Sequence, residues 1–223
     1  MASDVELLEV FRLAEVVGDV EVLTVVGDLL AGRWQSGSRF REMDQITRRS
    51  LAVQTSAATL LWAANSRLKL GLPYEALAFY NQALPICREV GDRAGEAATL
   101  TNIGSVYNGL GDRVQALAFY NQALPIRREV GDRAGEAVTR YNVAMIYRAL
   151  GRLSDAVSEL EIVVELDRQV QHPDLESDTA TLNQIRAELV DGSGSGPRSS
   201  GPGSGDQRKR GLSGLWRKKG GRA

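Results

Sequence analysis

A segment of 22 residues occurs twice in this chain, and its two copies start 40 residues apart. Ala76 to Ala97 reads ALAFYNQALPICREVGDRAGEA, and Ala116 to Ala137 repeats it with Arg127 in place of Cys87. Such an identity cannot arise from composition, and a fainter copy follows at the same spacing. A fixed period of this length predicts a repeat protein, in which each unit packs mainly on its neighbours.

Each unit has the pattern of two amphipathic helices joined by tight turns. Apolar residues recur at helical spacing, as in Leu100, Ile103, Tyr107 and Leu110. Each predicted helix is followed by a glycine, because a helix commonly ends on a residue that tolerates positive φ. These glycines are Gly71, Gly111 and Gly151 after the first helices and Gly91 and Gly131 after the second helices. The sequence therefore predicts an all-α fold.

Two further patterns concern packing within a pair of helices. Small residues recur where the helices must approach closely: Ala76, Ala83 and Gly104 in one register, and Ala116, Ala123 and Ala144 in the next. Pro85 and Pro125 lie inside the second helices, where a proline removes one backbone hydrogen bond. We therefore expect a bend or an early 3₁₀ turn at both prolines.

The pattern resembles the tetratricopeptide repeat, in the 40-residue form found in kinesin light chains, Pins-type polarity adaptors and many bacterial signalling proteins. The signature positions of that family are matched by Ile103, Gly104, Tyr107, Gly111, Ala116, Tyr120 and Ala123, and again by Val143, Ala144, Tyr147, Gly151 and Ala156. This resemblance implies a right-handed superhelical solenoid of helix-turn-helix repeats.

The resemblance also divides the chain into segments. We expect the repeat array over residues 54–190, with units at about 54–93, 94–133 and 134–173 and a closing helix at 175–190. Residues 191–205 are a Gly/Ser/Pro linker, and residues 206–223 are a basic tail. Because these last two segments cannot bury enough apolar surface to fold, we expect them to be disordered.

Residues 1–53 are expected to form degenerate helices of the same type. Leu7 to Gly18 resembles the second helix of a preceding unit, and Val20 to Leu30 the first helix of the next. Gly32 to Trp34 resembles the turn that follows, and a second helix is expected at about Phe40 to Ser50.

In this family the first helices line a concave face, where an asparagine bonds the backbone of an extended peptide. The matching residues are Asn102 and Asn142, whereas Trp62 and Leu182 occupy the equivalent positions of the flanking units. An amide can donate to a peptide carbonyl and accept from its N–H, so it holds a strand without reading the side chains. The alternative is that both asparagines only bond neighbouring helices.

Side chains one helical turn away on that face are expected to select the partner. They are Asn65, Leu68, Thr101, Ser105, Asn108, Tyr141, Met145 and Arg148. The face is polar with a few apolar anchors, and it lacks the lysine cluster with which family members hold a C-terminal carboxylate. We therefore expect a protein or peptide partner and no small-molecule substrate.

The residues that could carry catalysis do not form a recognisable site. His172 is the only histidine, and Cys87 is the only cysteine and is replaced by Arg127 in the copied segment. No nucleophile and base, metal-ligand set or phosphate-binding loop follows from such isolated residues. We expect no enzyme activity, no cofactor and no metal. The lone cysteine and the lack of a basic leader or long apolar run indicate a cytoplasmic protein.

The tail differs from the rest of the chain in charge. Residues 206–223 hold seven of the 27 Lys and Arg residues and one of the 28 acids, so the tail is +6 and the remainder of a chain of net charge −1 is −7. Such a tail can dock on anionic membranes or nucleic acid, solubilise the chain, or fold back on the acidic body. The residues expected to contact an anionic surface are Arg208, Lys209, Arg210, Trp216, Arg217, Lys218 and Lys219.

Together these observations favour a non-catalytic adaptor that binds a peptide segment in the groove of the repeats. Two alternatives stay open: a regulatory or sensor component that acts with a separate effector, and a tethering protein that uses its tail.

Overall fold

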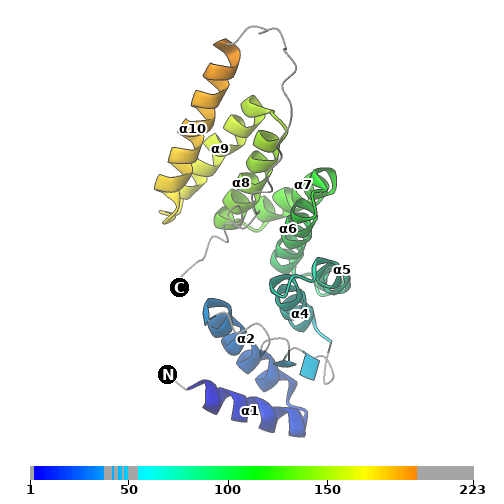
Figure 1. Ribbon diagram of the computed structural model, residues 1–223. Helices are drawn as coiled ribbons and strands as arrows, with labels where there is room; N and C mark the ends of the chain where they lie inside the picture. Colours follow the sequence, from blue (N-terminus) through cyan, green and yellow to red (C-terminus); the bar gives the residue numbers. More distant parts are fainter. Residues whose placement is uncertain (1–2, 38–41, 43–44, 47, 50–54, 195–223) are drawn as a thin grey trace, which may run out of the picture. The chain divides into compact units, whose positions relative to one another are not determined.

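The computed structural model describes residues 3–37, 42, 45–46, 48–49 and 55–194. Every regular element in these ranges is an α-helix, which confirms the all-α repeat fold (Figure 1). The helices fall into two compact units, Met1–Asp132 and Arg133–Ala223. None of the described helices has the length and hydrophobicity needed to cross a bilayer.

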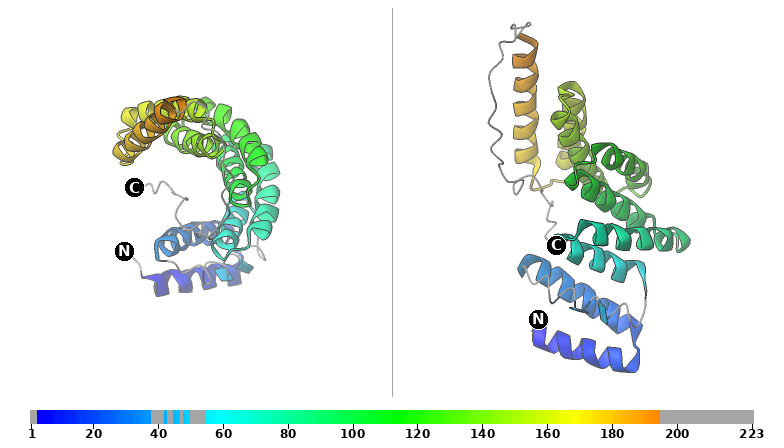
Figure 2. Two further views of the ribbon diagram at one scale, coloured as in Figure 1. Left: turned by 45° about the horizontal axis from the view of Figure 1, so that its top comes forward. Right: turned by 45° about the vertical axis from the view of Figure 1, so that its right-hand side comes forward.

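In the residues that the structure describes, the first unit begins with two N-terminal helices and continues with two helix pairs. These are α1 (Asp4–Val17), α2 (Val20–Gly37), α4 (Ala57–Lys69), α5 (Pro73–Glu89), α6 (Arg93–Gly109) and α7 (Arg113–Glu129). Helices α4 and α5, and α6 and α7, form antiparallel pairs, and α5 packs against α6 (Figure 2). The two first helices, α4 and α6, also contact each other.

The second unit continues the same arrangement with one pair and a closing helix. It contains α8 (Arg133–Ala149), α9 (Leu153–Gln169) and α10 (Leu175–Gly194). Helix α9 packs on both α8 and α10, and an apolar core of Leu160, Val164, Leu182 and Ile185 lies between them.

The helix-ending glycines behave as the sequence predicts. Each of the five has positive φ, between 70° and 87°. After Gly91, the N–H of Asp92 donates to the carbonyl oxygen of Cys87 at 2.8 Å, which satisfies the end of α5. The carboxylate of Asp92 then accepts from the N–H of Gly95 at 2.8 Å and caps α6. One short sequence thus closes one helix and opens the next.

The small residues lie at the closest helix contacts. Ala76, Ala83, Ala116 and Ala123 are fully buried. A Cβ atom added at Gly104 of α6 would lie 2.8 Å from Cε1 of Tyr120 and 3.1 Å from the carbonyl oxygen of Ala116, both in α7. The ring of Tyr120 therefore packs directly on the backbone of α6, which only glycine permits here.

The structure differs from the sequence predictions at three points. Helix α2 runs on to Gly37, so the expected turn at Gly32–Trp34 does not form. Gly32 keeps a helical backbone, because a glycine permits a turn but does not require one. Helices α5 and α7 pass through Pro85 and Pro125 without a 3₁₀ segment, so of the two expected outcomes the 3₁₀ turn is wrong and the bend stays a prediction. Each proline costs one hydrogen bond, but the packed neighbours hold the helix together.

The third difference is the end of α10, which lies at Gly194 rather than at residue 190. The prediction rested on composition, which marks where apolar packing stops rather than where backbone hydrogen bonds stop. The rest of the predicted linker and the whole basic tail lie outside the described residues, and so does most of the helix expected at Phe40 to Ser50.

Candidate functional site

The two asparagines expected to hold a peptide occupy the same position on successive first helices. Asn102 lies on α6 and Asn142 on α8, and both side chains are half-buried. In the described part of the chain, neither side-chain amide has a hydrogen-bond partner. Each therefore keeps a free donor and a free acceptor.

The equivalent positions on the flanking first helices belong to the core. Trp62 of α4 is 8% exposed, and its ring fills the space over Gly27 of α2, where an added Cβ would lie 2.6 Å from Cζ3. Leu182 of α10 is 4% exposed and packs with Ile185 against α9. A large apolar side chain in each case joins its helix to the preceding helices. Among the described first helices, only α6 and α8 therefore have an asparagine at this position.

Asn65 and Ser105 are engaged inside the repeats. The hydroxyl of Tyr80 in α5 donates to Oδ1 of Asn65 at 2.7 Å, and the hydroxyl of Tyr120 in α7 lies 3.1 Å from Oγ of Ser105. Both tyrosines are fully buried, and burial raises the pKa of Tyr120 to about 12 and also raises that of Tyr80. Asn65 and Ser105 thus satisfy buried hydroxyls that would otherwise have no partner.

Of the remaining residues expected to select the partner in the first unit, two are engaged within their own unit and one is not. Thr101 is buried, and its hydroxyl donates to the carbonyl oxygen of Ala97 at 2.8 Å, while Leu68 packs against the core. Asn108 is half-buried and has no hydrogen-bond partner among the described residues. Within this unit, α6 therefore presents Asn102 and Asn108 as free amides.

The expected positions in the second unit lie along α8. Tyr141 and Met145 are half-buried and pack against the core of this unit. Nε of Arg148 donates to Oε2 of Glu188 in α10 at 3.1 Å, and this hydrogen bond lowers the pKa of Glu188. Arg148 thus joins two successive first helices, and its charge is largely compensated by Glu188.

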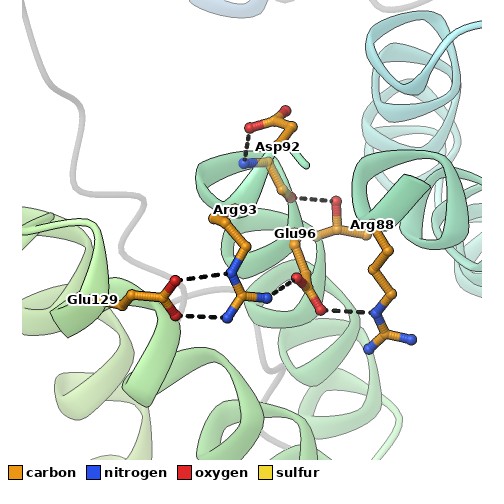
Figure 3. Close-up of polar contacts among 7 residues, drawn as sticks. Arg88, Asp92, Arg93, Glu96 and Glu129 are labelled. Atoms are coloured by element: carbon orange, nitrogen blue, oxygen red, sulfur yellow. Dashed lines mark hydrogen bonds and ion pairs between the residues drawn. The ribbon is translucent and has the colours of Figure 1, made fainter. Parts of the chain in front are cut away.

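A network of ion pairs in the first unit was not predicted. Glu96 of α6 is 5% exposed and accepts from Nε of Arg88 in α5 at 2.7 Å and from the guanidinium of Arg93 (Figure 3). Arg93 also donates to Glu129 at the end of α7, with Nη2 and Oε2 2.7 Å apart, and lowers the pKa of that carboxylate. The network ties the start of α6 to the ends of α5 and α7.

The second unit also has a cluster of ion pairs, which is centred on Arg140 in the middle of α8. Arg140 of α8 is buried where the preceding unit has Leu100, and its Nε donates to Glu136 at 2.9 Å. Its Nη1 donates to Glu159 of α9 at 2.5 Å. The only sequence signal for this cluster is the exchange of Leu100 for an arginine one repeat later.

The residue types most often used in catalysis have structural surroundings here. Cys87 is buried, and burial raises the pKa of its thiol, so the thiolate is disfavoured at neutral pH. Nδ1 of His172 accepts from the N–H of Asp174 at 3.1 Å and helps to shape the turn before α10. Among the described residues, no group of three or more His, Cys, Asp and Glu side chains is placed to hold a metal ion.

Comparison with known proteins agrees with this geometry. No curated protein matches the chain in sequence. Among solved structures, BtubC (BKLC) from P. vanneervenii matches with a TM-score of 0.62 and 20% identity, over 91% of this chain and 94% of that one. A putative kinesin light chain with nearly identical TPR-like repeats from Podosopora anserina gives 0.59 and 17%, over 79% and 91%. The apo form of RapI gives 0.67 and 15%, over 75% and 64%. At these identities the likeness concerns the fold.

The sequence itself matches the tetratricopeptide repeat over two overlapping ranges, residues 55–129 and 97–169. Together they span residues 55–169, which is just over half of the 223 residues. The helix pairs, the glycine turns and the close contact at Gly104 all fall inside these ranges. The chain therefore belongs to the tetratricopeptide repeat family, whose fold is a scaffold for protein–protein interaction.

Proposed function

We propose that this protein is a non-catalytic cytoplasmic adaptor that holds an extended segment of another protein against the first helices of its repeats. The observation that carries the proposal is the free amide of Asn102, repeated at Asn142. Half-buried amides normally find a partner, because a polar group that is partly removed from water loses hydrogen bonds that it had in the unfolded chain. A bound peptide backbone would supply these bonds.

The chemistry of an amide suits a peptide backbone. One side-chain amide offers a donor for a peptide carbonyl and an acceptor for a peptide N–H. Each such bond contributes on the order of 1 kcal/mol net, so two asparagines supply a modest affinity that does not depend on the side chains of the peptide. Selectivity must come from their neighbours.

The contacts within each unit show which residues near Asn102 and Asn142 are available to contact the side chains of a bound peptide. Asn65, Ser105 and Thr101 already bond groups of their own unit, and Arg148 is paired with Glu188. Asn108 remains as a free polar group, and Tyr141 and Met145 remain as partly exposed apolar surface on α8. We propose that these three residues contact the side chains of the bound segment.

The chain offers a matched control for a test of this proposal. Asn81 of α5 and Asn121 of α7 are also one repeat apart, but they are exposed on second helices. A peptide library displayed on phage would be selected on the full chain, and the affinity of selected peptides would be measured by calorimetry. We expect N102A/N142A to weaken binding by about thirtyfold to several hundredfold, since two to four hydrogen bonds of about 1 kcal/mol each are lost. N81A/N121A should bind as the unchanged chain does.

The same variants should separate binding from folding. Because the amides of Asn102 and Asn142 have no partner in the described part of the chain and alanine is the better helix former, N102A/N142A should unfold at a urea concentration no lower than that of the parent. Equal peptide affinity for N102A/N142A and the parent would contradict the proposal that Asn102 and Asn142 bind the peptide backbone. Capture of partners from the native cell, with and without the substitutions, would then distinguish an adaptor from a regulatory component that acts with a separate effector.

A second candidate function rests on the sequence of the tail. Residues 206–223 carry seven basic residues around Trp216, a composition that suits an anionic surface. We propose a tethering role as an addition to peptide binding. Vesicles containing phosphatidylserine should retain the full chain at low salt and lose it when Trp216, Arg217, Lys218 and Lys219 are all changed to serine. If the vesicles retain that variant as they retain the parent, the proposed tethering role is wrong.

A further inference from the structure

Helix α1 presents an apolar face to solvent at the start of the first unit. Its buried face is formed by Leu7, Phe11 and Ala14, which pack with α2 and Trp62. Five further apolar side chains of α1 lie outside that core and are between 42% and 77% exposed: Val5, Val10, Leu13, Val16 and Val17. An amphipathic helix at the edge of a soluble body normally has polar residues on its outer side.

Helix α10, the last helix that the structure describes, has such polar residues on its outer side. The outward side chains of α10 are mostly polar, and they include Glu176, Asn183, Gln184 and Arg186. A terminal helix of a repeat array needs such a face, because no further repeat covers it. On the outward side of α1 the five exposed apolar side chains stand beside only three exposed charged ones, Glu6, Glu9 and Arg12. A helix side on which exposed apolar residues outnumber the charged ones is a candidate interaction surface.

The residues along the middle of this face are spaced symmetrically, with a valine at each end and two opposite charges between them. Val5, Glu9, Arg12 and Val16 follow one another at intervals of four, three and four residues, so they lie within about 60° of each other around the helix. The order is apolar, acidic, basic, apolar. When a second α1 runs antiparallel, Val5 faces Val16 of the other copy and Glu9 faces Arg12, and each pair occurs twice.

The charges of this face favour such a pairing. Glu9 and Arg12 form an exposed pair in one helix, with Arg12 Nη2 and Glu9 Oε1 2.6 Å apart, and both side chains are more than half exposed. They can therefore bond across a two-fold axis as well. The other acids of α1 are engaged in their own unit: Asp4 with Arg33, Glu15 with Arg49 and Glu6 with the N-terminal cap at Ser3. Repulsion between the two helices is thereby reduced.

We propose that two copies of this chain associate through α1, packed antiparallel across a two-fold axis. The contact is isologous, which is the commonest form of homodimer. It removes Val5 and Val16 from water, places Leu13 at the edge of the contact, and forms a ring of four charges from the two Glu9–Arg12 pairs. The proposal is independent of peptide binding, because Asn102 and Asn142 lie on other helices.

The first test is sedimentation equilibrium of the full chain, whose protomer mass is 24.2 kDa. We expect a dimer, and we expect E9R to raise its dissociation constant at least about tenfold, because the introduced arginine would face Arg12 of the other copy twice. R12E should have a similar effect. The charge-swapped double variant E9R/R12E should dimerise as the parent does, because the swap restores an opposite charge at both facing positions across the two-fold axis.

The matched control uses a second exposed pair of the same kind. Glu165 and Arg168 of α9 are 2.5 Å apart at the same three-residue spacing, and both are more than half exposed. E165R makes the same change of charge away from α1, so it should leave the dimer intact. Equal weakening by E9R and E165R would mean a general charge effect and would overturn the proposal.

A second measurement tests the register without weakening the helix. Oxidation of V5C/V16C should link two copies through disulfides between position 5 of one and position 16 of the other, while V5C alone should give little product. Cys87 is buried and should not compete. A monomer at all concentrations up to about 100 μM, or failure of the swap to restore the dimer, would overturn the pairing; a different segment would then cover the face of α1.

Discussion

The hydroxyl of Tyr80 donates a 2.7 Å hydrogen bond to Oδ1 of Asn65, the residue 15 positions earlier on the partner helix. One repeat later, Tyr120 and Ser105 make the corresponding contact at 3.1 Å. In the third unit the tyrosine is replaced by Leu160, and the polar partner is replaced by Met145. The two positions change together, which indicates that each pair is a unit of packing.

The first prediction concerns this pair. N65A should destabilise the protein by about 1–3 kcal/mol, because the fully buried hydroxyl of Tyr80 loses its partner. Y80F removes the hydroxyl as well as the bond and should cost about 1 kcal/mol or less. Urea unfolding of both single variants and of N65A/Y80F gives the coupling energy. A loss from N65A no larger than that from Y80F would show that the hydroxyl finds another partner.

Gly104 provides the second prediction. Alanine usually stabilises a helix relative to glycine by roughly 0.5–1 kcal/mol. At Gly104 the added methyl group would lie 2.8–2.9 Å from two ring carbons of Tyr120, so G104A should instead destabilise by about 1–3 kcal/mol. The third unit already combines Ala144 with Leu160 at these two positions. The cost of G104A should therefore shrink in a Y120L background, as measured by the same unfolding experiment.

The third prediction concerns the turn between α9 and α10. Gln171 stands where the other second helices end in Gly91 and Gly131, and it adopts a φ of 51° that side chains disfavour. Q171G should therefore stabilise the protein by about 0.5–1 kcal/mol, after allowance for the extra freedom of glycine in the unfolded chain. The reverse change at the matched position, G131Q, should destabilise. Thermal unfolding of both variants checks the sign, and a loss of stability in Q171G would show that the Gln171 side chain has a role of its own.

The fourth prediction concerns alkaline pH. Burial raises the pKa of Tyr120 to about 12 from an unfolded value near 10, and it raises that of Tyr80 in the same direction. Above pH 10 the unfolded chain releases protons that the folded chain keeps, so the free energy of unfolding should fall as the pH rises from 10 to 12. The slope is about 1.4 kcal/mol per pH unit for each tyrosine. Urea midpoints of the parent should fall faster over this range than those of Y80F/Y120F.

Much of the fold could be predicted from local sequence signals. The spacing of apolar residues indicated the helices, and glycines such as Gly91 and Gly111 marked their ends, because both depend on residues that are close in the chain. The turn at Gly32 was predicted wrongly, since a glycine permits a turn but does not require one.

The candidate site was harder to predict, because its residues are defined by contacts with other helices. Asn65 and Ser105 look like free polar groups in the sequence, yet each meets a buried tyrosine from the neighbouring helix. A signal for this was present in the joint change to Met145 and Leu160 in the third unit. The replacement of Leu100 by Arg140 one repeat later likewise does not predict the contact of Arg140 with Glu159, because Glu159 lies on the neighbouring helix α9.

The sequence that closes α5 and caps α6 is repeated before α8, since Gly91 to Ala97 and Gly131 to Ala137 are identical. A deletion that joined Ala97 directly to Val138 would remove one whole repeat and leave the sequence of the cap unaltered. An insertion of the same 40 residues would likewise leave the sequence on both sides of each junction unchanged. The array can therefore differ by one whole repeat in either direction, and each product would still consist of complete helices with their proper ends.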